Sequence, residues 1–188
     1  MKNTFLQAIK LSLACLVFLS IIYTLFIFGI AQAAPNHGKG EMIAGNGKSY
    51  YANIGQSFTA DKYFNSRPSA VGYNAAGSGG SNKGPANPEY LAEVQKRIDT
   101  ILILNPDMKR SDIPADLVTA SGSGLDPNIS VLAAKFQVKR IAKARNIKVS
   151  QLETLIENHT EKPLLGLFGP EKINVLKLNI ALNNLKNE

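Results

Sequence analysis

Residues 11–30 read LSLACLVFLSIIYTLFIFGI, and this stretch divides the chain into an apolar N-terminal part and a more polar remainder. No residue from Leu11 to Ala34 carries a charge. A helix needs about 20 apolar residues to cross the hydrocarbon layer of a membrane, which is about 30 Å thick. We therefore predict a single transmembrane helix over residues 11–34.

A cleaved signal peptide is the competing interpretation of the same residues. Ala31-Gln32-Ala33 has the small-x-small form of a cleavage site. The apolar core of a signal peptide usually has about 7–15 residues, and the stretch over residues 11–30 is longer. Its length favours a retained anchor.

Two lysines, Lys2 and Lys10, precede the apolar stretch. Positive charges beside a membrane span favour the cytoplasmic side. We predict a cytoplasmic N-terminus over residues 1–10, a tether over 35–49 and an extracytoplasmic domain over 50–188. The basic character of that domain is no objection, because long domains are translocated largely regardless of their own charge.

The net charge of +7 does not by itself indicate a nucleic-acid partner. The basic residues are scattered rather than clustered with aromatic residues, and the chain has no Trp. This pattern is typical of a solvated surface. The one cysteine, Cys15, lies inside the apolar stretch. The domain therefore has no thiol nucleophile, disulfide or cysteine metal ligand, and a hydrophobic core must hold it together.

Helical periodicity dominates the second half of the chain. Asn87 and Pro88 are typical of a helix cap and a first helical residue, and Ser150 with Glu153 forms a capping box that predicts another helix start. We expect helices over 88–104, over about 130–146, from Ser150 and from about Asn174, with Leu91, Ile98, Ile141, Leu152, Ile156, Val175 and Leu178 facing the core. The predicted fold is one N-terminal transmembrane helix plus a mixed α+β, helix-rich extracytoplasmic domain with a few short strands.

Two segments have little apolar surface and many Gly and Ser residues. Residues 65–88 read NSRPSAVGYNAAGSGGSNKGPANP, which cannot sustain a helix or a central strand. A segment of this length is expected to be either disordered or functional. Residues 118–127 read VTASGSGLDP. We interpret them as a tight turn in which Gly122 and Gly124 adopt conformations that other residues avoid and Asp126 caps the next segment of the chain.

No catalytic or metal site is predicted. Gly47-Lys48-Ser49 resembles the end of a phosphate-binding P-loop, but Met42 stands where the first glycine is required. Ser123 lacks the preceding glycine of a nucleophile elbow. A catalytic triad also needs a histidine base, and only His37, in the tether, and His159, at a helix end, are present.

Several unusual strings occur in a fixed order after the apolar stretch: FNSRPSAVGYN, SGGSN, NPEYLAEVQKRID, DLVTASGSGLDPNIS, RIAKAR and NVLKLNIAL. Together they resemble the C subunit of the Kdp potassium-transporting ATPase, the KdpC family, from the anchor to the C-terminus. Asn128 and Val131 stand where the family often has His and Pro, so any role of that histidine does not transfer.

The resemblance implies a subunit of a P-type potassium pump in the bacterial cytoplasmic (inner) membrane. Its implied partners are a channel-like potassium subunit, a P-type ATP-hydrolysing subunit and a small stabilising subunit. The implied role is that of a catalytic chaperone that raises the affinity of the P-type subunit for ATP, without catalysis by this chain itself. Any effect on ATP would then act through the catalytic subunit, and we do not expect the chain to bind a cofactor of its own.

The candidate contact residues lie in the two polar segments, and their partner is left open between the nucleotide, another subunit and the domain itself. They are Arg67, Ser69, Tyr73, Asn74, Ser81, Asn82, Ser121, Gly122, Ser123, Gly124 and Asp126. Arg67 suits either an interface contact or an internal clamp. Direct ATP contact conflicts with the predicted topology, since it requires the domain to be cytoplasmic. The alternative function is a membrane-anchored extracytoplasmic binding module unrelated to transport.

Overall fold

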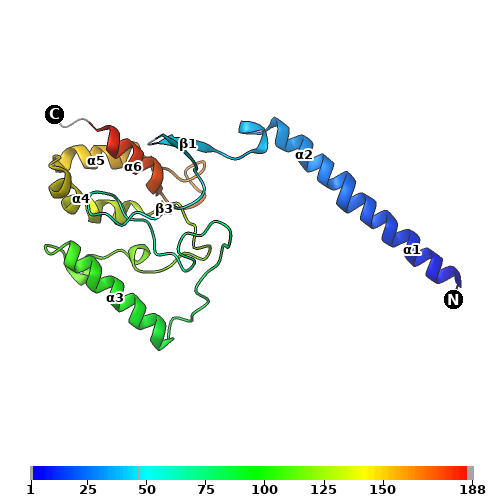
Figure 1. The fold of residues 1–188 in the computed structure, drawn as a ribbon, viewed down its shortest axis with the longest axis horizontal. Coiled ribbons are helices and arrows are strands. Elements are labelled where there is room, and N and C mark those ends of the chain that lie inside the picture. The colour runs from blue at the N-terminus through cyan, green and yellow to red at the C-terminus, as the bar shows by residue number, and fades with distance from the viewer. Residues whose placement is uncertain (1, 46, 186–188) are drawn as a thin grey trace. The chain divides into compact units, whose positions relative to one another are not determined.

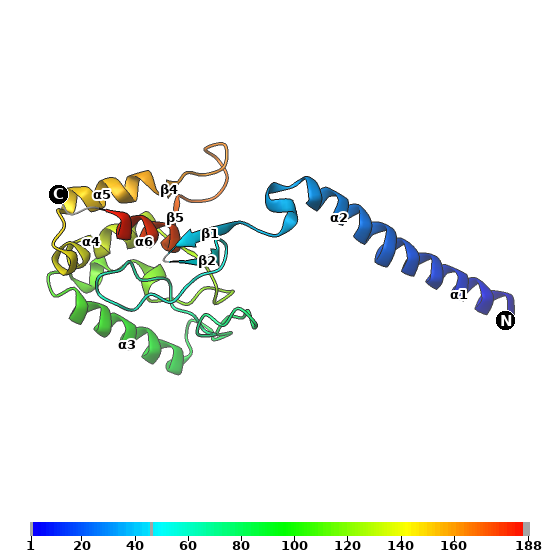
Figure 2. The same ribbon diagram turned by 45° about the horizontal axis from the view of Figure 1, so that its top comes forward.

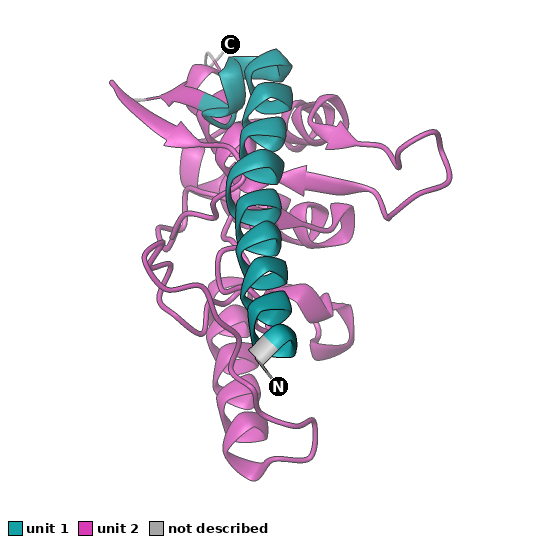
Figure 3. Cartoon of the chain, turned by 90° about the vertical axis from the view of Figure 1, so that its right-hand side faces the viewer, with its two compact units in different colours: residues 1–42 teal, residues 43–188 magenta. Residues whose placement is uncertain are grey.

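The computed structural model describes residues 2–45 and 47–185 and divides into two units, residues 1–42 and residues 43–188. Figure 3 colours these units separately, the first in teal and the second in magenta.

The first unit is a long apolar helix. It is built from α1 (Lys2–Leu16), a π-helical stretch η1 (Val17–Ile22) and α2 (Tyr23–Ala33). Within the described residues, one helix, Asn3–Ala33, is long and apolar enough to cross a membrane. The helix begins well before the predicted Leu11. The prediction followed the apolar run, but polar residues such as Lys10 can also form backbone hydrogen bonds of a helix, so the helix extends beyond that run. A 3₁₀ turn, η2 (Pro35–Gly38), follows.

A short hairpin opens the second unit. Strands β1 (Met42–Gly45) and β2 (Lys48–Tyr51) pair with each other, so part of the predicted tether carries regular structure. Gly47, the glycine of the excluded P-loop resemblance, lies between them with φ +74°. Its left-handed backbone serves the hairpin turn.

The core of the domain lies among three helices and a small sheet. The helices α4 (Val131–Arg145), α5 (Val149–Asn158) and α6 (Val175–Asn184) pack together (Figure 1). The antiparallel sheet has the order β3-β5-β4, from β3 (Asn128–Ile129), β5 (Lys172–Asn174) and β4 (Thr160–Glu161). The fully buried side chains include Phe64, Ile141, Leu152, Ile156, Ile173, Leu178 and Leu182. Most of the expected core positions are thereby confirmed.

Local capping residues set most helix starts as expected. Asn87 accepts a hydrogen bond from the Tyr90 N–H at the start of α3 (Pro88–Leu104), and Asn174 accepts one from Lys177 N–H. Ser130 caps α4 in the same way. The prediction that Ser150 caps the next helix was wrong, because the cap of α5 is Lys148, two residues earlier. The left-handed Asn146 (φ +55°) turns the chain sharply enough that α5 follows at once.

The helix α3 contributes less to the core than its periodicity predicts. Ile98 is buried, whereas Leu91 is about half exposed (52%). Two 3₁₀ turns, η3 (Arg110–Asp112) and η4 (Ala115–Leu117), connect α3 to the second polar segment.

Candidate functional site

The two Gly- and Ser-rich segments lie against each other. We call residues 66–82 the first polar loop and residues 118–126 the second polar loop. The Gly79 N–H donates to Ser123 O at 2.9 Å, and the Ser121 N–H donates to Pro68 O at 3.4 Å. These backbone hydrogen bonds join the loops along their length, so the first polar loop is ordered by the second.

An ion pair joins the start of the first polar loop to the end of the second. Arg67 Nη1 lies 3.0 Å from Asp126 Oδ2, and both side chains are about a quarter exposed (25% and 26%). Asp126 Oδ1 also accepts from the Asn128 N–H at 3.0 Å. Asp126 therefore does cap the segment that follows it, but this segment is strand β3 and not a helix, and Ser130 caps the helix. Arg67 is bonded inside the domain, as an internal clamp requires.

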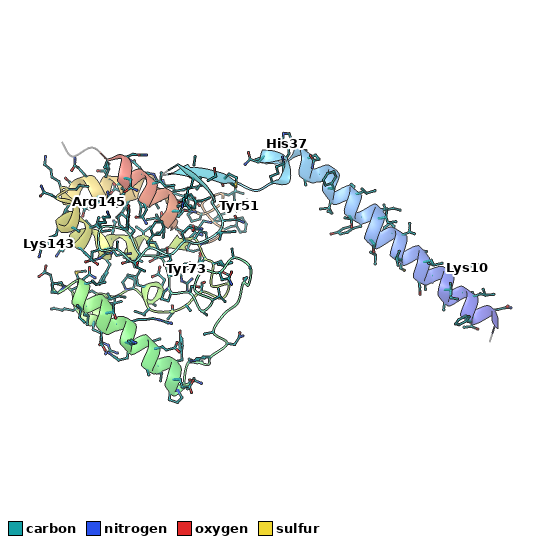
Figure 4. All side chains as sticks on the ribbon, viewed as in Figure 1. Lys10, His37, Tyr51, Tyr73, Lys143 and Arg145 are labelled. Carbon is teal, nitrogen blue, oxygen red and sulfur yellow. The ribbon has the colours of Figure 1, made fainter. Side chains whose placement is uncertain are left out.

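Ser69 and Tyr73 shape the first polar loop. Ser69 Oγ donates to Gly124 O at 2.6 Å and accepts from the Tyr73 N–H at 2.9 Å. The Tyr73 hydroxyl donates to Arg67 O, and Tyr73 has φ +60°. Figure 4 labels Tyr73 on the ribbon of the domain. Burial raises the pKa of the Tyr73 phenol; a hydrogen bond with Ser66 opposes this and the Asp126 charge adds to it.

The two glycines of the second polar loop have different roles. Gly124 has φ +67°, and a Cβ there would lie 2.6 Å from Val71 Cγ2 and 2.8 Å from Gly79 O. A Cβ at Gly122 would meet nothing within 4 Å. Gly124 is therefore required for the close approach of the loops, whereas Gly122 faces open space.

Both serines of the second polar loop bond within it. Ser121, which is buried, accepts from the Gly124 N–H at 3.0 Å, and Ser123 Oγ accepts from the Leu125 N–H at 3.1 Å. Of the candidate contact residues that have side chains, Asn74, Asn82 and Ser123 are exposed and Ser81 is half-buried. Among the described contacts, Ser81 and Asn82 make no side-chain hydrogen bond.

A buried polar cluster that was not predicted from the sequence holds the segment just before the first polar loop. Arg140 on α4, only 8% exposed, donates to Asp61 O, to Tyr63 O at 3.1 Å, to Asn65 Oδ1 at 2.9 Å and to Gln137 Oε1 at 2.7 Å. Burial lowers the pKa of the guanidinium, and the charge of Asp61 opposes that shift. The signal in the sequence is Arg140 three residues after Gln137 on an otherwise apolar helix face.

A cavity of about 430 Å³ lies between α3 and α4, and Ser66 at the start of the first polar loop is among the residues that line it. Its walls include Phe58, Ile101, Leu117 and Phe136, and Arg140 reaches one side. The apolar walls reflect the incomplete packing of α3 on the core.

The placement of the potential metal ligands and of His159 can be followed in the described part of the chain. No group of three or more His, Cys, Asp or Glu side chains is placed to hold a metal there. His159, expected at a helix end, has its Nδ1 2.8 Å from Leu155 O at the end of α5. This is the ordinary interaction of a histidine with terminal carbonyls.

The fold and the loops define a class: a protein with one apolar N-terminal helix and a mixed domain in which polar loops form a scaffold. The family model of the "K+-transporting ATPase, c chain" (KdpC) matches residues 5–184, and the chain belongs to this family. It is 56% identical to the potassium-transporting ATPase KdpC subunit of Flavobacterium johnsoniae over 99% of this chain and 100% of that one. It is 54% identical to that of Bacteroides fragilis, with 98% and 99% covered. It is 45% identical to that of Caldanaerobacter subterraneus, with 94% and 92% covered.

Proposed function

We propose that this accessory subunit of the potassium-transporting ATPase assembles and stabilises the pump from the outer side of the membrane. Its domain docks on the outer face of a channel-like potassium subunit, near ion entry. Because the chain belongs to the family of this pump subunit, we do not propose the alternative function of a binding module unrelated to transport. The single observation that carries the proposal is that most polar side chains of the two loops are bonded inside the domain.

That bonding pattern favours docking over catalysis. Arg67, Ser69 and Ser121 have partners inside the domain, so they brace a surface rather than present reactive groups. The surface they brace includes the exposed Asn74, Asn82 and Gly122. Carboxamides and bare backbone on a rigid loop suit a polar contact with another protein.

The chain acts on ATP indirectly under this proposal. As a catalytic chaperone it raises the ATP affinity of a P-type subunit by stabilising the assembled pump, and a small stabilising subunit completes the complex. A second candidate is direct nucleotide contact at the second polar loop. The open space at Gly122 favours it, because exposed backbone N–H groups of such a loop suit phosphate oxygens.

Topology decides between these two candidates. In a Cys15→Ser background, Asn74→Cys provides one exposed thiol on the domain. We expect a membrane-impermeant thiol reagent to label it in intact cells and not in inverted vesicles. Labelling only in inverted vesicles places the loops with the cytoplasmic nucleotide and refutes docking on the outer face.

Assembly is tested with the whole pump. A tagged full-length chain should co-purify the channel-like and ATP-hydrolysing subunits, and omission of the chain should raise the KM for ATP of the remaining complex. An unchanged subunit yield and an unchanged KM for ATP without this chain contradict the proposal.

A further inference from the structure

The connection between β4 and β5 exposes an unusual amount of apolar surface. We call residues 164–168, LLGLF, the apolar tip. Its four large side chains are Leu164, Leu165, Leu167 and Phe168, and they are 70%, 80%, 80% and 64% exposed. Figure 2 shows this connection, in orange, standing out from the helices of the domain. Contiguous exposed apolar groups mark a binding surface more often than scattered ones do.

Four of the five N–H groups of the apolar tip bond within the turn. The N–H of Leu164 donates to Phe168 O at 3.1 Å, and the N–H of Phe168 donates to Leu164 O at 3.0 Å. The Gly166 and Leu167 N–H groups bond to Pro163 O and Leu164 O. A loop that meets lipid must pair its polar backbone groups internally, because hydrocarbon offers no partner. The closed turn meets that requirement for these N–H groups.

The tip holds a leucine where the backbone favours glycine. Leu165 has φ +55°, and Gly166 beside it has φ +72°. A branched side chain in the left-handed region is uncommon, and such strain gathers at functional positions. Leu165 nevertheless points an 80% exposed side chain outward, so the fold itself gains no burial from it.

The charges flank the tip and do not enter it. Residues 163–170 contain no charged residue, and Lys162 and Glu171 stand on either side. At the base, Lys172 pairs with Glu161 at 3.6 Å. An apolar end over a charged base matches the change from acyl chains to headgroups at a bilayer surface.

We propose that the apolar tip inserts into the interfacial layer of the bilayer that holds the N-terminal helix. The inference rests on the membrane anchoring in the proposed function and on no other part of it. Only residues 34–41 separate α2 from β1, so the domain cannot move far from the membrane. Because this connection is short, lipid is an apolar phase near the domain whether or not other subunits are bound.

The chain has no Trp, so the Trp fluorescence of a variant with one introduced Trp reports on the environment of that position alone. We would place the full chain carrying Leu167→Trp in phosphatidylcholine vesicles, with and without brominated acyl chains. We expect a blue-shifted emission and strong quenching by the brominated lipid. The matched control is Leu132→Trp on α4, where Leu132 is 72% exposed; its emission should stay that of a solvated indole with weak quenching.

Further variants keep the test decisive. Phe168→Trp replaces Leu167→Trp if the latter does not fold, and adding Leu165→Asp to either should abolish the quenching. Flotation of the protein with the vesicles tests membrane anchoring separately. A protein that does not float with the vesicles refutes the anchor, and a protein that floats without quenching refutes insertion of the tip. Quenching that equals the control, or a blue shift that needs the other pump subunits, overturns the proposal in favour of water or a protein partner.

Discussion

At the scale of single residues, the polar loops depend on contacts between side chains that are distant in the sequence. Arg67 and Asp126 are 59 positions apart and form an ion pair with about three quarters of each side chain covered. Exposed ion pairs contribute about 0–1 kcal/mol, and we expect this partly covered pair to lie at the upper end of that range. Tyr73 adds a hydroxyl bond to the Arg67 carbonyl.

Replacement of Arg67 by Ala should lower the melting temperature of the full chain by about 2–6 °C, since it removes roughly 1 kcal/mol of internal bonding. Thermal unfolding followed by circular dichroism in nanodiscs measures this. Lys135→Ala, an exposed change on α4, should leave the melting temperature unchanged. If Arg67→Ala weakens pump assembly while the melting temperature holds, Arg67 is an interface residue instead.

Tyr73 predicts a loss of stability in alkali. Its pKa is raised in the folded chain by burial, whereas an unfolded Tyr ionises near pH 10. The unfolded state therefore loses the proton first, and the free energy of unfolding falls as the pH rises above about 10. Urea unfolding at about pH 9 and about pH 11 should show a smaller drop for Tyr73→Phe than for the native chain. An equal drop for both contradicts a neutral, buried phenol.

At the scale of elements, close approach of the two polar loops determines which glycine matters. A Cβ at Gly124 would clash with the first polar loop, whereas a Cβ at Gly122 would meet nothing within 4 Å. The buried cluster around Arg140 then joins α4 to residues 61–65. The two polar loops thus hold each other, and helix α4 holds the segment that precedes the first loop.

Gly124→Ala should reduce the free energy of unfolding by about 2 kcal/mol or more, because the new Cβ clashes with Val71 and with the Gly79 carbonyl at a left-handed backbone position. Gly122→Ala is the matched control and should change it by less than about 0.5 kcal/mol. Urea titration of both variants measures the difference. Equal effects would mean that the loops do not pack as described. A stable Gly122→Ala chain that fails to assemble would identify Gly122 as a docking position.

Arg140→Ala should destabilise the domain more than any change in the polar loops, by about 3 kcal/mol, because it leaves several buried acceptors without a donor. Chemical denaturation of the full chain measures the loss, and Lys139→Ala, on the exposed side of the same helix, is the control. A loss below about 1 kcal/mol would show that water reaches this cluster.

At the scale of the whole molecule, the anchor and the domain have separate physical origins. The helix Asn3–Ala33 depends on its apolar composition, and the domain depends on the core among α4, α5, α6 and the sheet. The apolar tip is a third feature, which neither the helix nor the core explains.

The N-terminal helix should remain on the mature protein. Its apolar stretch exceeds the length of a signal-peptide core, so the intact mass of the protein purified from membranes should include residues 1–34. An N-terminus at Ala34, found by Edman degradation or mass spectrometry, would show cleavage and would also remove the anchor on which insertion of the apolar tip depends.

The apolar helix, the approximate positions of α3, α4 and α6, the Asn87 cap and the family could all be predicted from the sequence. Each of these depends on neighbouring residues or on ordered strings, which a linear reading contains. The start of α5 was missed because the αL turn at Asn146 was not recognised. The packed structure was needed to show that Arg67 binds Asp126, that Gly124 and not Gly122 is sterically required, and that Arg140 is buried. The same holds for the exposure of the apolar tip, since LLGLF suits a core as well as a surface. Contacts between distant segments decide these points, because burial and close approach are properties of the packed chain.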